Sequence, residues 1–111
     1  MTTLTALLDH LYEGDVIDTV DVARVSDTNP RSVTLWKAQA AVPRRAAEER
    51  LLELRAVVDL ARRVMRDNGV RFWLRPPNPD LGYEKPLDLI AQGHYQRVID
   101  LLLALAEGVT A

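Results

Sequence analysis

The chain has 111 residues, of which 48% are hydrophobic and 27% charged, and its formal net charge at pH 7 is −2. This length allows one compact domain or two very small helical lobes that share a core, and the charged fraction argues against disorder. Because there is no cysteine, neither a disulfide framework nor a thiolate metal site can form, and a reducing cytosol is the simplest setting. The first residues have no basic segment, and no apolar run approaches the ~18 residues that cross a bilayer. We therefore expect a cytoplasmic protein with no membrane contact.

The charges are divided along the chain. Residues 1–30 carry six acidic side chains against one basic, residues 31–75 carry eleven basic against five acidic, and residues 76–111 carry five acidic against two basic. A basic middle between acidic ends is typical of a face that contacts phosphate groups. On charge alone, a solvated helix surface is the favoured explanation of the same pattern.

Apolar residues at helical spacing, bounded by cap residues, predict three helices in the first part of the chain: residues 3–14, 18–26 and 30–38. The clearest start is Asn29 followed by Pro30, an N-cap residue before a proline at the first helical position. In the helix that follows, Val33 and Trp36 are expected to face inward.

The longest helical pattern runs from Pro43 to Asn68 and is the expected central element of the fold. One apolar stripe follows it: Leu51, Leu54, Val58, Ala61 and Met65. Asn68 and Gly69 are expected to end this helix as a C-cap.

Prolines and glycines divide the last third of the chain into short pieces. Helical turns are predicted at residues 70–74, 79–81 and 86–92, and a final apolar helix at residues 95–107. No segment alternates between apolar and polar residues between hairpin turns, so we expect no strand and an all-α fold.

The sequence offers no plausible catalytic set. His10 and His94 belong to no metal-binding spacing, the carboxylates are scattered over polar faces, and the five glycines stand alone and form no phosphate loop. We therefore expect no enzyme, no cofactor and no metal.

The helices predicted at residues 18–26 and 30–38 are joined by a tight polar turn, and Ala23 is small enough for close packing between them. This pattern is typical of a helix-turn-helix. In that geometry six side chains would meet base edges or phosphates: Arg31, Ser32, Thr34 and Lys37, flanked by Arg44 and Arg45. A helical hairpin that merely completes the core would have the same pattern.

Two sets of spaced residues carry a resemblance. The N-terminal set is Asn29-Pro30-Arg31-Ser32-Val33, Trp36 and Val42-Pro43; the C-terminal set is Trp73, Pro77-Asn78, Leu81, Lys85-Pro86, Asp88-Leu89, Gly93, Tyr95-Gln96-Arg97-Val98 and Ala106-Glu107-Gly108-Val109. With these residues the chain resembles, over nearly its whole length, the Xre/MbcA/ParS antitoxins of bacterial type II toxin–antitoxin systems, and most of all the mycobacterial members.

The resemblance implies an all-α fold in which an Xre-like helix-turn-helix domain with the long central helix (residues 1–68) precedes a toxin-binding domain (residues 69–111). It implies a RES-domain toxin that destroys NAD as the partner, operator DNA as a second one, and a homodimer within a toxin–antitoxin hetero-oligomer. The implied toxin contacts are a docking face and a C-terminal segment that blocks the toxin's active site: Trp73, Pro77, Asn78, Leu81, Tyr95 and Arg97, then Gly108, Val109, Thr110 and Ala111.

Two positions depart from the family pattern. The family has a glycine in the turn between the two helices, where this chain has residues 26–28, and a second glycine soon after the Trp36 position, where this chain has residues 37–40. Two other hypotheses fit the residues. One is a DNA-binding repressor whose C-terminal half only dimerises it, and the other is an adaptor with no toxin.

Overall fold

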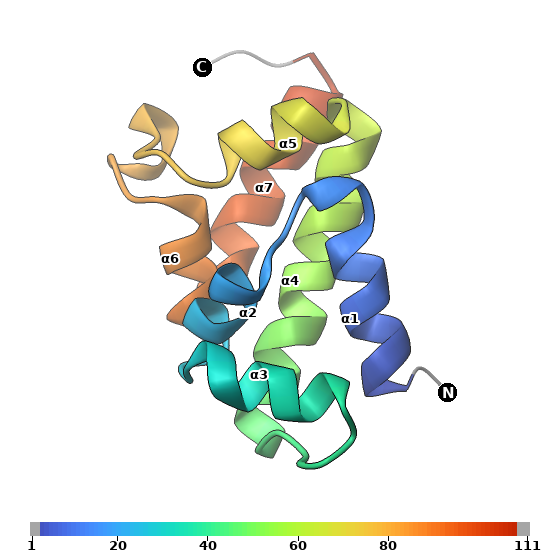
Figure 1. Ribbon diagram of the computed structural model, residues 1–111. Helices are drawn as coiled ribbons and strands as arrows, with labels where there is room; N and C mark the ends of the chain where they lie inside the picture. Colours follow the sequence, from blue (N-terminus) through green and yellow to red (C-terminus); the bar gives the residue numbers. More distant parts are fainter. Residues whose placement is uncertain (1–2, 109–111) are drawn as a thin grey trace.

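A computed structural model describes residues 3–108, and these residues form an all-α fold with no strand (Figure 1). The seven α-helices of this part are α1 (Leu4–Tyr12), α2 (Thr19–Val25), α3 (Pro30–Lys37), α4 (Arg45–Val64), α5 (Asp67–Trp73), α6 (Pro86–Ala91) and α7 (Tyr95–Ala106). Two 3-10 helices, η1 (Glu13–Asp15) and η2 (Pro79–Leu81), lie in the connections. The predicted fold class is confirmed.

The predicted starts of the first three helices are confirmed by their caps. The Thr3 side chain accepts a hydrogen bond from the Ala6 N–H, and Asn29 accepts one from the Ser32 N–H. Asp18 and Asp21 each accept from the other's backbone N–H, which makes a reciprocal capping box. These contacts satisfy N–H groups that have no partner within their own helix.

The prediction of one helix from Pro43 to Asn68 is wrong at its end. Helix α4 stops at Val64, residues 65–66 are extended, and α5 begins at Asp67. The break turns α5 across the end of the bundle (Figure 1), where Val70 becomes buried. The expected C-cap glycine, Gly69, lies inside α5. Because Met65 continues the apolar stripe of α4, the spacing of apolar residues does not indicate that the helix ends at Val64.

Gly14 holds the junction between η1 and α5. Its φ of +67° lies in the left-handed region, and a Cβ at this position would overlap the Asp67 carboxylate. Only glycine meets both conditions without strain.

Helix α4 runs through the centre of the molecule and packs against α1 and along α7 (Figure 1). The core is one continuous cluster that includes Leu8 and Val22 from the first part of the chain and Leu87 and Leu102 from the last. Helix α2 contacts α6, and Arg24 forms an ion pair with Asp88 between these two helices. The two segments predicted as domains therefore share a core; a domain boundary at residue 68 stays a prediction.

Within residues 3–108, no helix combines the length and the apolar character that crossing a membrane requires.

Candidate protein-binding and DNA-binding surfaces

A short loop after α5, residues 78–84, is held in one conformation by its own backbone. We call it the η2 loop. The Asn78 N–H donates to the Glu84 carbonyl at 3.1 Å, and the Tyr83 N–H donates to the Asn78 carbonyl at 2.8 Å. Leu81, only 3% exposed, anchors the loop in the core. The loop is therefore held by its own backbone hydrogen bonds and by the burial of Leu81 in the core.

Arg97 on α7 fastens this loop from the side. Its Nη1 donates to Glu84 Oε2 at 2.9 Å, and its Nη2 donates to the Leu81 carbonyl at 3.2 Å. Both charged side chains are nearly half exposed. Arg97, predicted as a docking residue, thus acts first within the chain, by orienting the η2 loop.

The other predicted docking residues lie close along the chain to this loop or on the helix that contacts it. Trp73 ends α5 and Tyr95 begins α7; both are half-buried and pack against the core. Pro77 is exposed and Asn78 half-buried. The η2 helix contacts α7, the helix that carries Tyr95 and Arg97. The buried Leu81 can influence a partner only through the shape of the loop.

Of the predicted C-terminal segment, residues 108–111, the structure describes only Gly108. Gly108 is exposed, with φ +75°, and follows Glu107, the C-cap of α7. Val109, Thr110 and Ala111 lie outside the described residues.

Two exposed aromatic residues were missed by the sequence reasoning. Phe72 is 75% exposed and Tyr83 is 73% exposed. The helical spacing of Val70 and Leu74 could have placed Phe72 on the outer face of α5. No sequence signal showed the backbone conformation of Tyr83.

Helices α2 and α3 pack against each other across the predicted turn. Asp27 in this turn has φ +56°, and Gln39 after α3 has φ +60°. These are the two regions where the family pattern has glycine, and this chain has a left-handed backbone there at residues other than glycine. Its use as a DNA-binding helix-turn-helix stays a prediction.

The six residues predicted to contact DNA differ in exposure and in the contacts that their side chains already make within the chain. Ser32 is half-buried and the other five are exposed. Thr34 donates to the Pro30 carbonyl at 3.0 Å, Lys37 lies 4.7 Å from the centre of the Tyr12 ring, and Arg45 lies 3.6 Å from Glu49. Among residues 3–108, Arg31 and Arg44 have no ion pair.

A cleft of about 580 Å³ adjoins this surface. Its walls come from the α2–α3 turn, α3, the loop before α4, the first turns of α4 and the end of α6. They include Thr28, Trp36, Val42, Arg44 and Arg50. Mixed apolar and basic walls are compatible with a macromolecular contact and supply no catalytic set.

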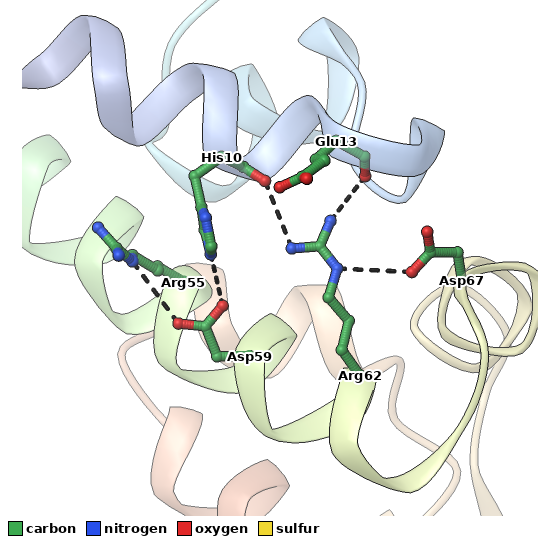
Figure 2. Close-up of polar contacts among 6 residues, drawn as sticks. All are labelled: His10, Glu13, Arg55, Asp59, Arg62 and Asp67. Carbon is green, nitrogen blue, oxygen red and sulfur yellow. Dashed lines mark hydrogen bonds and ion pairs between the residues drawn. The ribbon is translucent and has the colours of Figure 1, made fainter.

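A polar cluster joins α1, α4 and α5 (Figure 2). Arg62 donates to the carbonyls of His10 at 3.4 Å and Glu13 at 2.6 Å, and its Nε lies 3.6 Å from Asp67. His10 Nε2 is hydrogen-bonded to Asp59 Oδ1 at 2.5 Å. The described residues hold no group of three or more His, Cys, Asp or Glu side chains that could bind a metal. The arrangement fastens three helices together, which is a structural task.

Known proteins resemble this chain in sequence and in fold. The family model of the antitoxin Xre/MbcA/ParS C-terminal toxin-binding domain matches residues 53–108. The mycobacterial cidal antitoxin MbcA of Mycobacterium tuberculosis H37Rv is 42% identical over 89 residues, which are 80% of this chain and 79% of that antitoxin. A probable mycobacterial cidal antitoxin of the same organism is 35% identical over 79 residues, 71% of this chain and 67% of that one.

The fold agrees with these relatives. A chain in the crystal structure of the M. tuberculosis MbcT–MbcA toxin–antitoxin complex superposes with a TM-score of 0.86 at 34% identity, covering 100% of both chains. A helical chain with these relatives and a toxin-binding domain over half its length is an antitoxin of a toxin–antitoxin system. It belongs to the Xre/MbcA/ParS antitoxin family.

Proposed function

We propose that this antitoxin binds a RES-domain toxin that degrades NAD and neutralises it by placing residues 108–111 in the toxin's active-site cleft. The observation that carries the proposal is the match of residues 53–108 to a toxin-binding domain. The relative with the same fold was crystallised in a toxin–antitoxin complex. We further propose that the antitoxin is a homodimer within the hetero-oligomer.

The position of α7 supports the inhibitory mechanism. This helix packs along α4, buries Val98 and Leu102, and ends at Ala106, two residues before Gly108. A tail that leaves a firmly anchored helix has a high effective concentration at a neighbouring site once the helix is docked. The tail's own affinity for the cleft can then be modest, and occlusion still follows.

Deletion of residues 108–111 tests the mechanism. We expect the shortened antitoxin to keep its helical circular dichroism spectrum and still bind the toxin, while NAD consumption by the toxin resumes. Deletion of residues 1–2 is the control, because α1 begins at the opposite end of the bundle from the end of α7 (Figure 1). Full inhibition by the protein without residues 108–111 would contradict the blocking mechanism; a full-length chain that binds no toxin would contradict the proposed function.

A second proposed function is operator binding through α3 and the start of α4. The supporting observation is that Arg31, Lys37, Arg44 and Arg45 are all exposed there. Each phosphate contact contributes to affinity and to its salt dependence. We expect Arg31→Glu with Lys37→Glu to abolish a gel shift with the operon's own promoter, and Arg63→Glu, an exposed arginine on α4, to leave it unchanged. A shift unaffected by the double variant would count against DNA binding at this surface. A chain that shifts DNA and binds no toxin would favour the repressor hypothesis.

A further inference from the structure

Tyr83 has an unusual backbone for an aromatic residue. Its φ is +64°, directly after Gly82, whose φ is also +64°. Glycine adopts this left-handed region freely, and Asn or Asp do so at small cost, whereas a bulky side chain is disfavoured there. The residue nevertheless occupies it in a loop where glycine would fit without strain.

The surroundings of Tyr83 enforce this conformation. Its N–H donates to the Asn78 carbonyl at 2.8 Å, and the next N–H, of Glu84, donates to the Leu81 carbonyl at 3.2 Å. Arg97 holds Glu84 from α7. A strained residue persists only where neighbouring contacts determine its conformation in this way, and such residues cluster at functional sites.

The Tyr83 side chain makes few contacts within the molecule that could offset this backbone strain. Tyr83 is 73% exposed, and its hydroxyl forms no hydrogen bond within residues 3–108. Ring burial therefore does not explain why tyrosine stands here. A role in folding would be better served by glycine or asparagine.

We propose that Tyr83 is a preorganised anchor of the toxin interface, whose ring enters an apolar pocket of the toxin with a polar group at its edge. This inference rests on the proposed function. The toxin is the partner argued for because Tyr83 lies within residues 53–108, the part matched to the toxin-binding domain. The loop that carries it is also held by Arg97 and Leu81, two residues on which the family resemblance depends.

A rigid exposed tyrosine suits this task physically. Tyrosine is among the residues that most often dominate interface affinity, because a large ring with few rotatable bonds loses little entropy on binding. A loop that is already fixed avoids the further cost of ordering a segment during association. Backbone strain in the free antitoxin is thus compatible with tight binding in the complex.

The test compares four variants of the full chain for toxin affinity and for thermal unfolding of the free antitoxin. The probe is a purified RES-domain toxin, the partner named in the proposed function. Tyr83→Gly and Tyr83→Asn remove the ring and relieve the backbone. We expect each to weaken the Kd for the toxin about 30-fold or more, while the Tm stays unchanged or rises by about 2–5 °C. Tyr83→Phe keeps the ring and should stay within about threefold of the wild-type Kd.

Val20→Ser is the matched control, because Val20 is an exposed apolar residue outside residues 53–108. We expect its toxin affinity to equal that of the wild type. A fall in Tm for both Tyr83→Gly and Tyr83→Asn would assign the ring a structural role and overturn the proposal. An unchanged Kd for these variants, measured beside a wild type that binds the toxin, would also overturn the proposal. The same holds if these variants lose self-association but still bind the toxin. A wild-type chain that does not bind the toxin overturns this inference and the proposed function together.

Discussion

The carboxylate of Asp21 accepts a hydrogen bond from the guanidinium of Arg75, and the two form an ion pair between α2 and the segment that follows α5. Asp21 is buried, and the same arginine also donates to the Val16 carbonyl at 3.1 Å and the Arg71 carbonyl at 2.5 Å. One guanidinium thus connects the start of the predicted DNA-binding region with the chain that leads into the η2 loop.

Arg75→Met should lower the free energy of unfolding by about 2–3 kcal/mol. Removing one partner of a fully buried pair costs ~3–5 kcal/mol because the other charge is left unpaired, and the effect is smaller here because the Arg75 side chain is 32% exposed. Urea unfolding followed by circular dichroism measures the change. Arg63→Met, on the exposed side of α4, is the control and should cost less than ~0.5 kcal/mol. Equal losses in the two variants would contradict a specific role for the pair.

The contribution of Asp21 to stability should depend on pH. Burial raises the pKa of the Asp21 carboxyl, an effect that exceeds the lowering by the Asp18 backbone N–H and by Arg75. The folded chain then holds this proton at a higher pH than the unfolded chain, so stability falls as pH rises from the unfolded pKa of about 3.9 through the raised folded pKa.

The variant Asp21→Asn removes the titrating carboxyl and so isolates its pH-dependent contribution to stability. The advantage of the wild type over Asp21→Asn in free energy of unfolding should be larger near pH 4 than at pH 7. An advantage that grows with pH would mean that the charge of Arg75 outweighs burial and that the pKa is lowered.

Gln39→Gly should stabilise the antitoxin by about 0.5–1 kcal/mol. Gln39 has φ +60°, a conformation that costs a non-glycine residue ~1–2 kcal/mol, while glycine loses ~0.5–1 kcal/mol more entropy on folding. The exposed hydrogen bond from Gln39 Nε2 to Thr5 Oγ1, 3.2 Å long, is a minor loss. Gln39→Ala loses that bond and keeps the strain, so its Tm should lie below that of Gln39→Gly. The reverse order would refute the strain argument.

Arg62→Met should destabilise the fold by about 1–3 kcal/mol, because it removes charged hydrogen bonds to the carbonyls of His10 and Glu13 and the ion pair with Asp67 (Figure 2). The control is Arg55→Met, which removes only the ion pair with Asp59, one turn further along the same helix. This variant should cost ~0.5 kcal/mol or less. Thermal unfolding of both variants decides; a larger loss for the Arg55 variant would contradict the role of Arg62.

Arg97→Met should weaken toxin binding more than it weakens the fold. The exposed pair with Glu84 contributes at most ~1 kcal/mol to stability, but without it the η2 loop must be ordered during binding. Kd measurements beside Tm values test this, with Arg97→Lys as an intermediate that keeps the charge and loses the two-pronged contact. An unchanged Kd for Arg97→Met would show that the loop needs no clamp.

The sequence by itself determined most of the helical boundaries. Thr3, Asp18 and Asn29 mark helix starts through contacts three residues away, and Pro86 begins α6 as predicted. These are local interactions, and the residues that make them lie within one helical turn of each other. The all-α class follows from the same local patterns.

Only the tertiary structure decided the end of α4, the clamp by Arg97 and the conformation of Tyr83. The apolar stripe runs past Val64 into Met65, so the break appears only once α5 packs across the bundle and buries Val70. Arg97 meets Glu84 across thirteen positions of sequence, and Asp21 meets Arg75 across fifty-four. Such pairs are set by how helices pack rather than by spacing along the chain, so the family pattern could name Arg97 but not say what it holds.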